Sequence, residues 1–138
     1  MTEIKSDYLT IQRSDEEIFQ FLADFRNFGK LMPEQVINFQ ATAGECSFTI
    51  KGMADISLTM AEKKPHTLIS YHSGNKSPLA FSINSHIQKS GIDNTRVMLV
   101  LEADLSPMLK MMAERPLQNF VNLIAGKLKE QMERDSGS

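Results

Sequence analysis

The sequence predicts an α+β domain with one antiparallel sheet and a long C-terminal helix. Three observations carry this prediction: a helix-capping sequence at residue 14, alternating apolar and polar residues in short runs from residue 37 to residue 104, and apolar steps of three and four from residue 109 onward. Strands joined by such short connections pair antiparallel, so we expect seven strands in one sheet. At 138 residues the chain is most simply one domain, residues 1–138, in which residues 134–138 form a frayed tail.

The composition indicates an ordinary globular protein and argues against some kinds of partner. Hydrophobic residues make up 41% of the chain and charged residues 23%, as in ordinary globular proteins. The net charge is −2 and the cations are spread along the chain, so we expect no nucleic-acid partner. No apolar run approaches the roughly eighteen residues of a membrane span, and charged residues interrupt the start, where a signal peptide would lie. With the single cysteine, Cys46, these features predict a cytoplasmic monomer or homodimer.

The first strand is expected within residues 3–12, where β-prone side chains form a short run. A helix then begins at Ser14, whose hydroxyl forms a capping box with the carboxylate of Glu17. Apolar residues follow at helical spacing, at Ile18, Phe21, Leu22 and Phe25. We expect Gly29 to loosen or end this helix, and residues 30–32 to add at most a short second helical turn.

The six remaining strands are expected in residues 37–42, 47–51, 54–60, 67–73, 81–88 and 97–104. Residues 74–78 have the composition of a loop. The run from Val97 to Leu101 is apolar on both faces, which predicts a central strand. Ile69 and Tyr71 are expected to face inward. The other side chains expected in the inward phase are Phe48, Ile50, Ile56, Leu58, Met60, Phe81, Ile83, Ser85, Leu99 and Leu101.

The last helix is predicted by a long apolar stripe. Its members are Leu109, Met112, Ala113, Pro116, Leu117, Phe120, Val121, Ile124, Ala125, Leu128 and Met132. Pro116 has no N–H for the carbonyl of Met112, so the helix is expected to bend or restart there. The bend either lets the helix follow a curved sheet or turns the Met112 carbonyl toward a pocket. Met108, Met111 and Met112 are flexible side chains that either fill the core or line a cavity.

Two stretches resemble the START/SRPBCC superfamily, which includes the birch pollen allergen and the polyketide cyclases. They are "IQRSDEEIFQFLADFRNFGKLMP" and "LSPMLKMMAERPLQNFVNLIAGKLKEQM". The first resembles the superfamily's opening, in which a strand leads through a Ser-Asp cap into E-E-[IV]-[FW]-x-F-L-x-D and then N-F-x-K-L-x-P. The resemblance covers essentially the whole chain and implies the helix-grip fold. In this fold a curved seven-stranded sheet wraps around the last helix, two short helices close one end, and a hydrophobic cavity lies between sheet and helix.

The resemblance implies binding of a hydrophobic small molecule, lipid-like or aromatic. We expect binding without chemical change, because the sequence contains no catalytic motif, and we expect no cofactor. Tyr71 and Ser85 interrupt inward apolar phases, so their hydroxyls are expected to orient the ligand. The residues expected to contact it are Phe28, Met32, Phe48, Ile56, Leu58, Tyr71, Phe81, Ile83, Ser85, Leu99, Leu101, Met108, Met112 and Phe120.

Two other functions stay open at this point. The first is an enzyme of the polyketide cyclase or aromatase kind, in which Tyr71, His72 or Asp24 would transfer protons. The second is a protein-binding module like the Hsp90 cochaperone or ribosome-associated toxin branches, which would use Met98 and Val100 on the outer face. The histidines and the cysteine show no metal-ligand spacing and no catalytic motif is present, so we expect neither a metal site nor catalytic residues.

Overall fold

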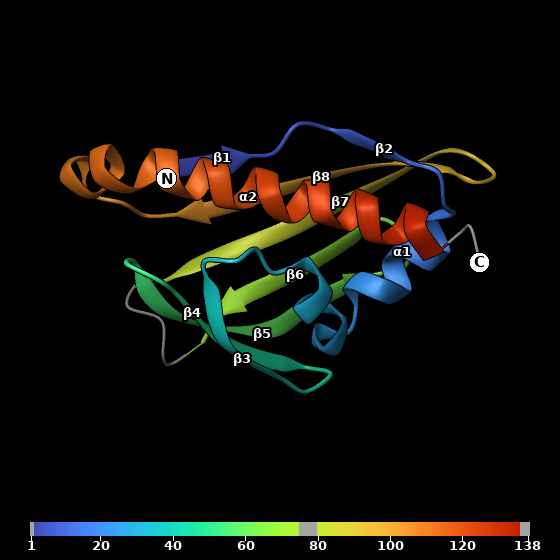
Figure 1. Cartoon of the computed structure of the whole chain (residues 1–138). Coiled ribbons are helices and arrows are strands. Elements are labelled where there is room, and N and C mark those ends of the chain that lie inside the picture. The colour runs from blue at the N-terminus through green and yellow to red at the C-terminus, as the bar shows by residue number, and fades with distance from the viewer. Residues whose placement is uncertain (1, 75–79, 136–138) are drawn as a thin grey trace.

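The structure, a computed structural model, describes residues 2–74 and 80–135. Its elements follow the order β1 (Thr2–Lys5), β2 (Leu9–Ile11), α1 (Asp15–Leu22), the 3-10 helix η1 (Phe25–Leu31), β3 (Val36–Ala41), β4 (Glu45–Ile50), β5 (Ala54–Lys64), β6 (Leu68–Ser73), β7 (Phe81–Gly91), β8 (Asn94–Ala103) and α2 (Pro107–Asp135) (Figure 1). The predicted α+β class is therefore confirmed. Of the predicted loop at residues 74–78, residues 75–78 lie outside the described residues.

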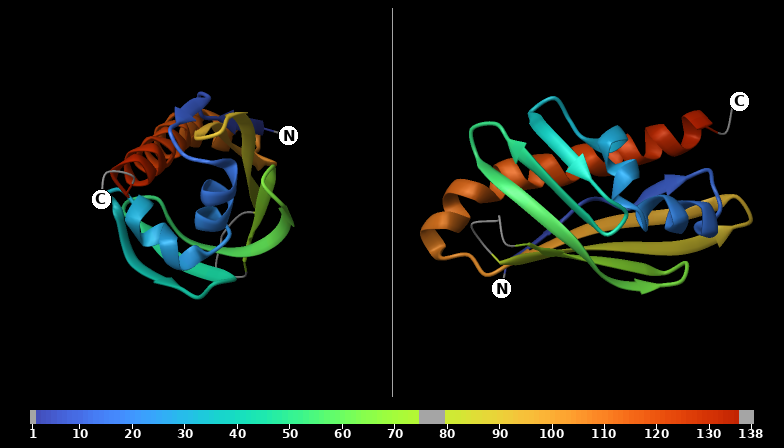
Figure 2. Two further views of the ribbon diagram at one scale, coloured as in Figure 1. Left: turned by 90° about the vertical axis from the view of Figure 1, so that its right-hand side faces the viewer. Right: turned by 90° about the horizontal axis from the view of Figure 1, so that it is seen from below.

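One antiparallel sheet contains all the described strands. Its order is β1-β8-β7-β6-β5-β4-β3, and β2 also pairs with β8. Sequential hairpins produce this order from β3 to β8, as the short connections predicted. The sheet curves around α2, while α1 and η1 lie toward one end (Figure 2). Sheet and helix thus have the helix-grip arrangement.

The predicted first strand is divided into β1 and β2 by Ser6 and its neighbours. The Ser6 N–H donates to the Leu99 carbonyl at 2.9 Å, and its buried hydroxyl accepts from the Leu99 N–H, also at 2.9 Å. The side chain thus takes the place of a backbone carbonyl where the strand is interrupted. This break explains why residues 2–74 and 80–135 contribute eight strands to the sheet instead of the seven expected.

The helical region after Ser14 begins as predicted and ends earlier. The Ser14 hydroxyl accepts from the Glu17 N–H at 3.1 Å, which confirms the cap. The expectation that Phe25 continues this helix is wrong, because α1 ends at Leu22 and the Asp24 carboxylate accepts from the Arg26 N–H at 2.9 Å. This second cap starts η1, which is longer than the short turn expected around residues 30–32.

A bulge in β3 changes which of its side chains face the core. Asn38 has a φ of 57°, and the pairing register of β3 with β4 shifts between Ile37 and Gln40. Ile37 is consequently 41% exposed, whereas Phe39 packs against the core. The simple alternation expected for this strand therefore fails at the bulge.

Helix α2 packs tightly only in its second half. Val121, Ala125, Leu128 and Met132 are buried there, at helical steps of three and four, among core residues of the sheet and the first helices. Helix α2 continues through Pro116 without interruption. The first turns of α2 bend away from the axis of the remaining turns (Figure 2). The helix continues through Arg134 and Asp135, which were expected in the frayed tail.

Within residues 2–74 and 80–135, no helix combines the length and apolar character that crossing a membrane requires.

Candidate functional site

An apolar cavity of about 340 Å³ lies between the concave face of the sheet and the first half of α2. We call it the main cavity. Its lining residues are Phe48, Ile50, Met53, Ala54, Ile56, Leu58, Phe81, Ile83, Leu101, Ala103, Leu105, Leu109, Ala113, Leu117 and Phe120. Every one of these side chains is apolar, so the wall offers no side-chain hydrogen bond to a ligand.

The strand and helix periods together produce this wall. Phe48, Ile50, Leu58 and Leu101 alternate inward along their strands. On α2, steps of four and three place Leu109, Ala113, Leu117 and Phe120 on one face. Ala54, Ala103 and Ala113 contribute only methyl groups, which leaves space that longer side chains would fill.

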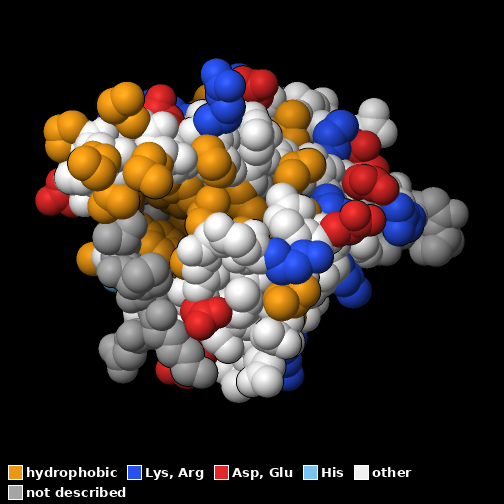
Figure 3. Space-filling view, turned by 60° about the vertical axis from the view of Figure 1, so that its left-hand side comes forward, with side chains coloured by type: hydrophobic (Ala, Val, Ile, Leu, Met, Phe, Trp, Pro, Cys, Tyr) orange, Lys and Arg blue, Asp and Glu red, His pale blue; other side chains and the backbone are white. Residues whose placement is uncertain are grey.

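The main cavity opens at the end of the molecule where α2 begins. Met53 and Leu109 line the cavity and are 41% and 40% exposed, so the apolar wall continues to the surface there. Hydrophobic side chains gather around this hollow in Figure 3. Met108, Met111 and Met112 are exposed on the same stretch of helix. The opening of the main cavity is therefore bordered by an apolar surface.

A second apolar space of about 50 Å³, the inner cavity, lies farther along α2 toward α1 and η1. It is lined by Leu22, Phe28, Leu31, Met32, Phe48, Leu58, Tyr71, Ile83, Ser85, Leu99, Phe120, Val121, Ile124 and Leu128. Phe48, Leu58, Ile83 and Phe120 line both cavities. These four side chains therefore form the boundary between the two spaces.

Tyr71 and Ser85 face inward as predicted, but their hydroxyls already have partners in the protein. The Tyr71 hydroxyl donates to the Leu22 carbonyl at 3.0 Å and accepts from the Ser85 hydroxyl at 3.4 Å. The rings of Phe25 and Phe28 lie 5.2 and 5.3 Å from the Tyr71 ring, between centroids. Burial raises the pKa of Tyr71 far above its ordinary value, because the phenolate would lose its hydration. The hydroxyl therefore stays neutral and ties β6 to the end of α1.

The structure distributes the predicted site residues over three places. Those that line the main cavity are Phe48, Ile56, Leu58, Phe81, Ile83, Leu101 and Phe120. Those that line only the inner cavity are Phe28, Met32, Tyr71, Ser85 and Leu99. Met108 and Met112 line neither and are 71% and 70% exposed, because the inward stripe of α2 runs through Leu109 and Ala113.

Sequence reasoning missed half of the main cavity. The residues it did not assign to the site are Ile50, Met53, Ala54, Ala103, Leu105, Leu109, Ala113 and Leu117. A usable signal was present in α2: Leu109, Ala113 and Leu117 are spaced by four, whereas Met108 and Met112 belong to a neighbouring row of the helix.

The side chains considered for proton transfer lie apart from the main cavity. The Asp24 carboxylate caps η1 and pairs with the Arg26 guanidinium at 2.6 Å, so hydrogen bonds from Arg26 lower its pKa. His72 is exposed and pairs with Thr59 across β5 and β6. Cys46 is buried, and burial raises the pKa of its thiol to about 12. Among the described residues, no three potential ligands from His, Cys, Asp and Glu form a metal-binding group.

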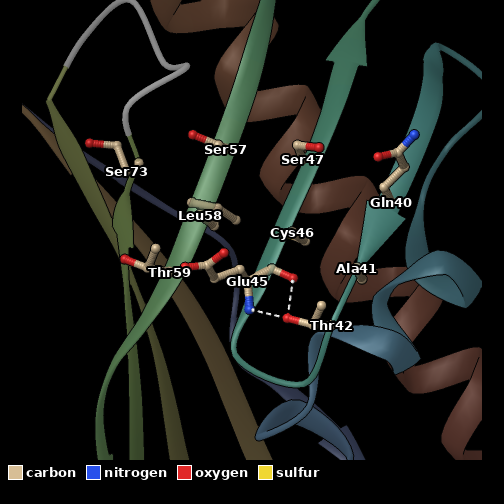
Figure 4. A pocket seen from close by; sticks show the side chains of 11 residues that line it. Gln40, Ala41, Thr42, Glu45, Cys46, Ser47, Ser57, Leu58, Thr59 and Ser73 are labelled. Atoms are coloured by element: carbon tan, nitrogen blue, oxygen red, sulfur yellow. Dashed lines mark hydrogen bonds between the residues drawn. The ribbon is translucent and has the colours of Figure 1, made fainter.

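A polar groove of about 590 Å³ crosses the sheet from β3 to β6. Figure 4 shows its side chains, among which Gln40, Ser47, Ser57 and Ser73 lie side by side on successive strands. The outward-facing side chains of β4 and β5, such as Ser47, alternate with buried residues such as Cys46. The groove is thus part of the solvated face of the sheet.

The predicted outer-face residues Met98 and Val100 do not form an apolar patch. Val100 is only 3% exposed. Beside it, the Ser70 hydroxyl donates to the Asn84 side-chain oxygen at 2.6 Å, and the Asn84 amide donates to Glu102 at 3.4 Å. This part of the outer face is therefore polar and internally hydrogen-bonded.

Comparison with known proteins gives matches to solved structures. No family model and no curated protein matches the sequence. A norcoclaurine synthase point mutant from Thalictrum flavum, in complex with a transition state analogue, has a TM-score of 0.76 at 12% identity, with 98% of this chain and 96% of that chain covered. The Aha1 dimer from Colwellia psychrerythraea gives 0.73 at 16% identity, covering 96% and 97%. A START superfamily protein from Mycobacterium smegmatis gives 0.70 at 15% identity, with the same coverage of 96% and 97%. The chain therefore has the helix-grip fold of the START/SRPBCC superfamily, as its sequence motifs predicted.

Proposed function

We propose that the protein binds a hydrophobic small molecule, lipid-like or aromatic, in the main cavity and does not change it chemically. The observation that carries this proposal is the wholly apolar wall of a cavity of about 340 Å³. Cavities lined only by apolar side chains stay dry and take apolar guests. The volume lies toward the lower end of the roughly 300 to 1,000 Å³ usual for small-molecule sites.

Because the wall of the main cavity is apolar, the buried part of the ligand must be apolar as well. A ligand hydroxyl or amide buried against this wall would lose its water without gaining a side-chain partner, at a cost of about 1 to 3 kcal/mol. A polar group of the ligand therefore belongs at the opening between Met53 and Leu109, where solvent reaches it. This favours an amphiphile whose apolar end enters first.

Binding without turnover is supported by the positions of the ionisable side chains. Asp24 and His72 do not line the main cavity, and the Tyr71 hydroxyl is bonded to the Leu22 carbonyl. A general acid or base must lie within hydrogen-bonding reach of the group it serves.

We further infer a cytoplasmic location, since the single Cys46 is free and buried, as is usual in a reducing compartment.

The proposed function is tested by a substitution that fills part of the main cavity with a larger side chain. Ala113→Phe adds a ring to the wall of the main cavity, and Asn119→Phe adds the same ring to an exposed position of α2. Delipidated protein is titrated with a fluorescent fatty-acid analogue, and the folded state of each variant is checked by circular dichroism. We expect Ala113→Phe to weaken binding at least about tenfold and Asn119→Phe to leave it unchanged.

Two results would contradict the proposed function. One is wild-type protein that neither binds the analogue nor gains thermal stability from it. The other is Ala113→Phe that folds and binds as tightly as the wild type, since the ligand would then occupy some other surface.

A further inference from the structure

We propose that the stacked rings of Phe48 and Phe120 set the maximum chain length of the ligand, with Phe120 as the residue that determines this specificity. The inference rests on the proposed function, because it concerns how far a ligand chain extends from the main cavity. Both rings line the main cavity on one side and the inner cavity on the other. A chain that fills the main cavity therefore ends against them.

The two rings differ in how firmly they are held. Phe48 is 5% exposed, its strand pairs with β3 and β5, and the ring of Phe39 stacks behind it at a centroid distance of 6.3 Å. Phe120 lies on α2 at a centroid distance of 6.4 Å from Phe48, with an interplanar angle of 22°. Phe120 is only partly buried and borders empty space in both cavities. Of the two, Phe120 is the less buried ring, so its replacement disturbs the core less than replacement of Phe48.

The space beyond the boundary suits the end of an apolar chain. The hydroxyls of Tyr71 and Ser85 are hydrogen-bonded to each other, and Tyr71 also to the Leu22 carbonyl. The remaining lining residues of the inner cavity are apolar, and its volume of about 50 Å³ corresponds to a very short extension of a chain. Removal of the Phe120 ring therefore opens the boundary on the side of α2 and admits a longer chain into the inner cavity.

Three variants of α2 distinguish the effect of the boundary from the effects of enlarging either cavity alone. Phe120→Ala removes the boundary ring that α2 contributes, Leu117→Ala enlarges only the main cavity, and Ile124→Ala enlarges only the inner cavity. Phe120→Leu serves as a milder change at the boundary, in case the alanine variant does not fold. Each protein is loaded with a fluorescent fatty-acid analogue, which saturated fatty acids from octanoate to stearate then displace.

We expect the wild type to show an optimum chain length and Phe120→Ala to move this optimum to a longer acid. Its affinity for the longer acid relative to the shorter one should rise about tenfold, which is the order expected for two further buried methylenes. Phe120→Leu should move the preference in the same direction by less. Ile124→Ala should keep the wild-type optimum, because the boundary is intact.

Two outcomes would overturn this inference while leaving the proposed function in place. One is a wild-type length optimum that neither Phe120 variant moves, and the other is an equal shift in Leu117→Ala. If no fatty acid displaces the analogue from any protein and the analogue itself does not bind, the proposed function fails and this inference fails with it.

Discussion

At the scale of single residues, the alternation along β4 decides the chemistry of the one cysteine. Cys46 faces the core with Phe48 and Ile50, while Ser47 and Thr49 face outward. Burial disfavours the thiolate and raises the pKa of Cys46 to about 12. Because the thiolate is the nucleophilic form, the cysteine behaves as a small core side chain.

We predict that native Cys46 reacts with iodoacetamide far more slowly than a cysteine at the next position. The matched control is Cys46→Ser combined with Ser47→Cys, which moves the thiol to the solvated face. The control should be labelled at least roughly a hundredfold faster at mildly alkaline pH, and the two should become similar in denaturant. Mass spectrometry of timed samples measures both rates. Equal rates in the native proteins would show that solvent reaches Cys46 through the sheet.

At the residue scale, the sequence predicted which way strand side chains point but not which groups their hydroxyls bond to. Alternation alone placed Tyr71 and Ser85 inward, since side-chain direction in a strand is a local property. The partner of the Tyr71 hydroxyl, the Leu22 carbonyl, is 49 residues away and depends on where α1 ends. Met108 and Met112 were assigned to the wall by their chemistry, whereas the orientation of α2 decides which face is buried.

At the scale of elements, α2 is fixed to the edge of the sheet by polar contacts in its middle and second half. The Gln118 amide donates to the Lys5 carbonyl at 2.7 Å, and the Lys129 ammonium donates to the Thr10 carbonyl at 2.6 Å. Near the helix end, Arg13 donates to the Met132 carbonyl at 2.9 Å. These contacts hold the packed half of α2 in place, and all of them lie beyond the residues at the cavity opening.

The pairing of Glu133 predicts a pH-dependent contribution to this attachment. Its carboxylate accepts from Lys129 at 2.9 Å and from the Gln12 N–H at 3.1 Å, and these bonds lower its pKa below the ordinary value of about 4.5. A lowered pKa in the folded state means that the contribution is complete above the unfolded value and is lost as the pH falls through the folded one. For a partly exposed pair it amounts to about 0.2 to 1 kcal/mol.

Glu133→Gln should therefore lower the free energy of unfolding at neutral pH by this amount and make no difference in acid. Urea denaturation at a series of pH values gives the profile. Glu130→Gln is the control, because Glu130 pairs with Arg134 at 2.8 Å on the same helix and both side chains are largely exposed. A Glu130→Gln profile as altered as that of Glu133→Gln would contradict the assignment.

The position of α2 was predictable from its stripe, but its continuity was not. Burial of the stripe at Val121, Ala125 and Leu128 outweighs the roughly 3 kcal/mol cost of an interior proline, so Pro116 is tolerated within the helix. Likewise, the divided first strand depends on Ser6 meeting Leu99, which is 93 residues away. The spacing of apolar residues reflects only local geometry. It therefore predicts neither the packing that keeps α2 continuous through Pro116 nor the bond between Ser6 and Leu99.

At the scale of the whole molecule, packing and empty space are segregated along α2. The half that contains Leu128 is packed against the sheet, α1 and η1, and the half that contains Leu117 covers the main cavity. The size of this cavity is the difference between the space enclosed by the curved sheet and the volume of the side chains inside it. Sequence patterns give the second quantity but not the first, so the fold was predictable and the cavity volume was not.

This segregation predicts unequal costs for the same substitution at two leucines of one helix. Leu128 is 1% exposed in the core, so Leu128→Ala should lower the free energy of unfolding by about 2 to 5 kcal/mol. Leu117 already borders empty space and loses fewer contacts, so Leu117→Ala should cost less than half as much. Urea denaturation of ligand-free protein, with comparable m-values, measures both costs. If Leu117→Ala cost as much as Leu128→Ala, the first half of α2 would be as tightly packed as the second, and the main cavity would be too well filled in solution to receive a ligand.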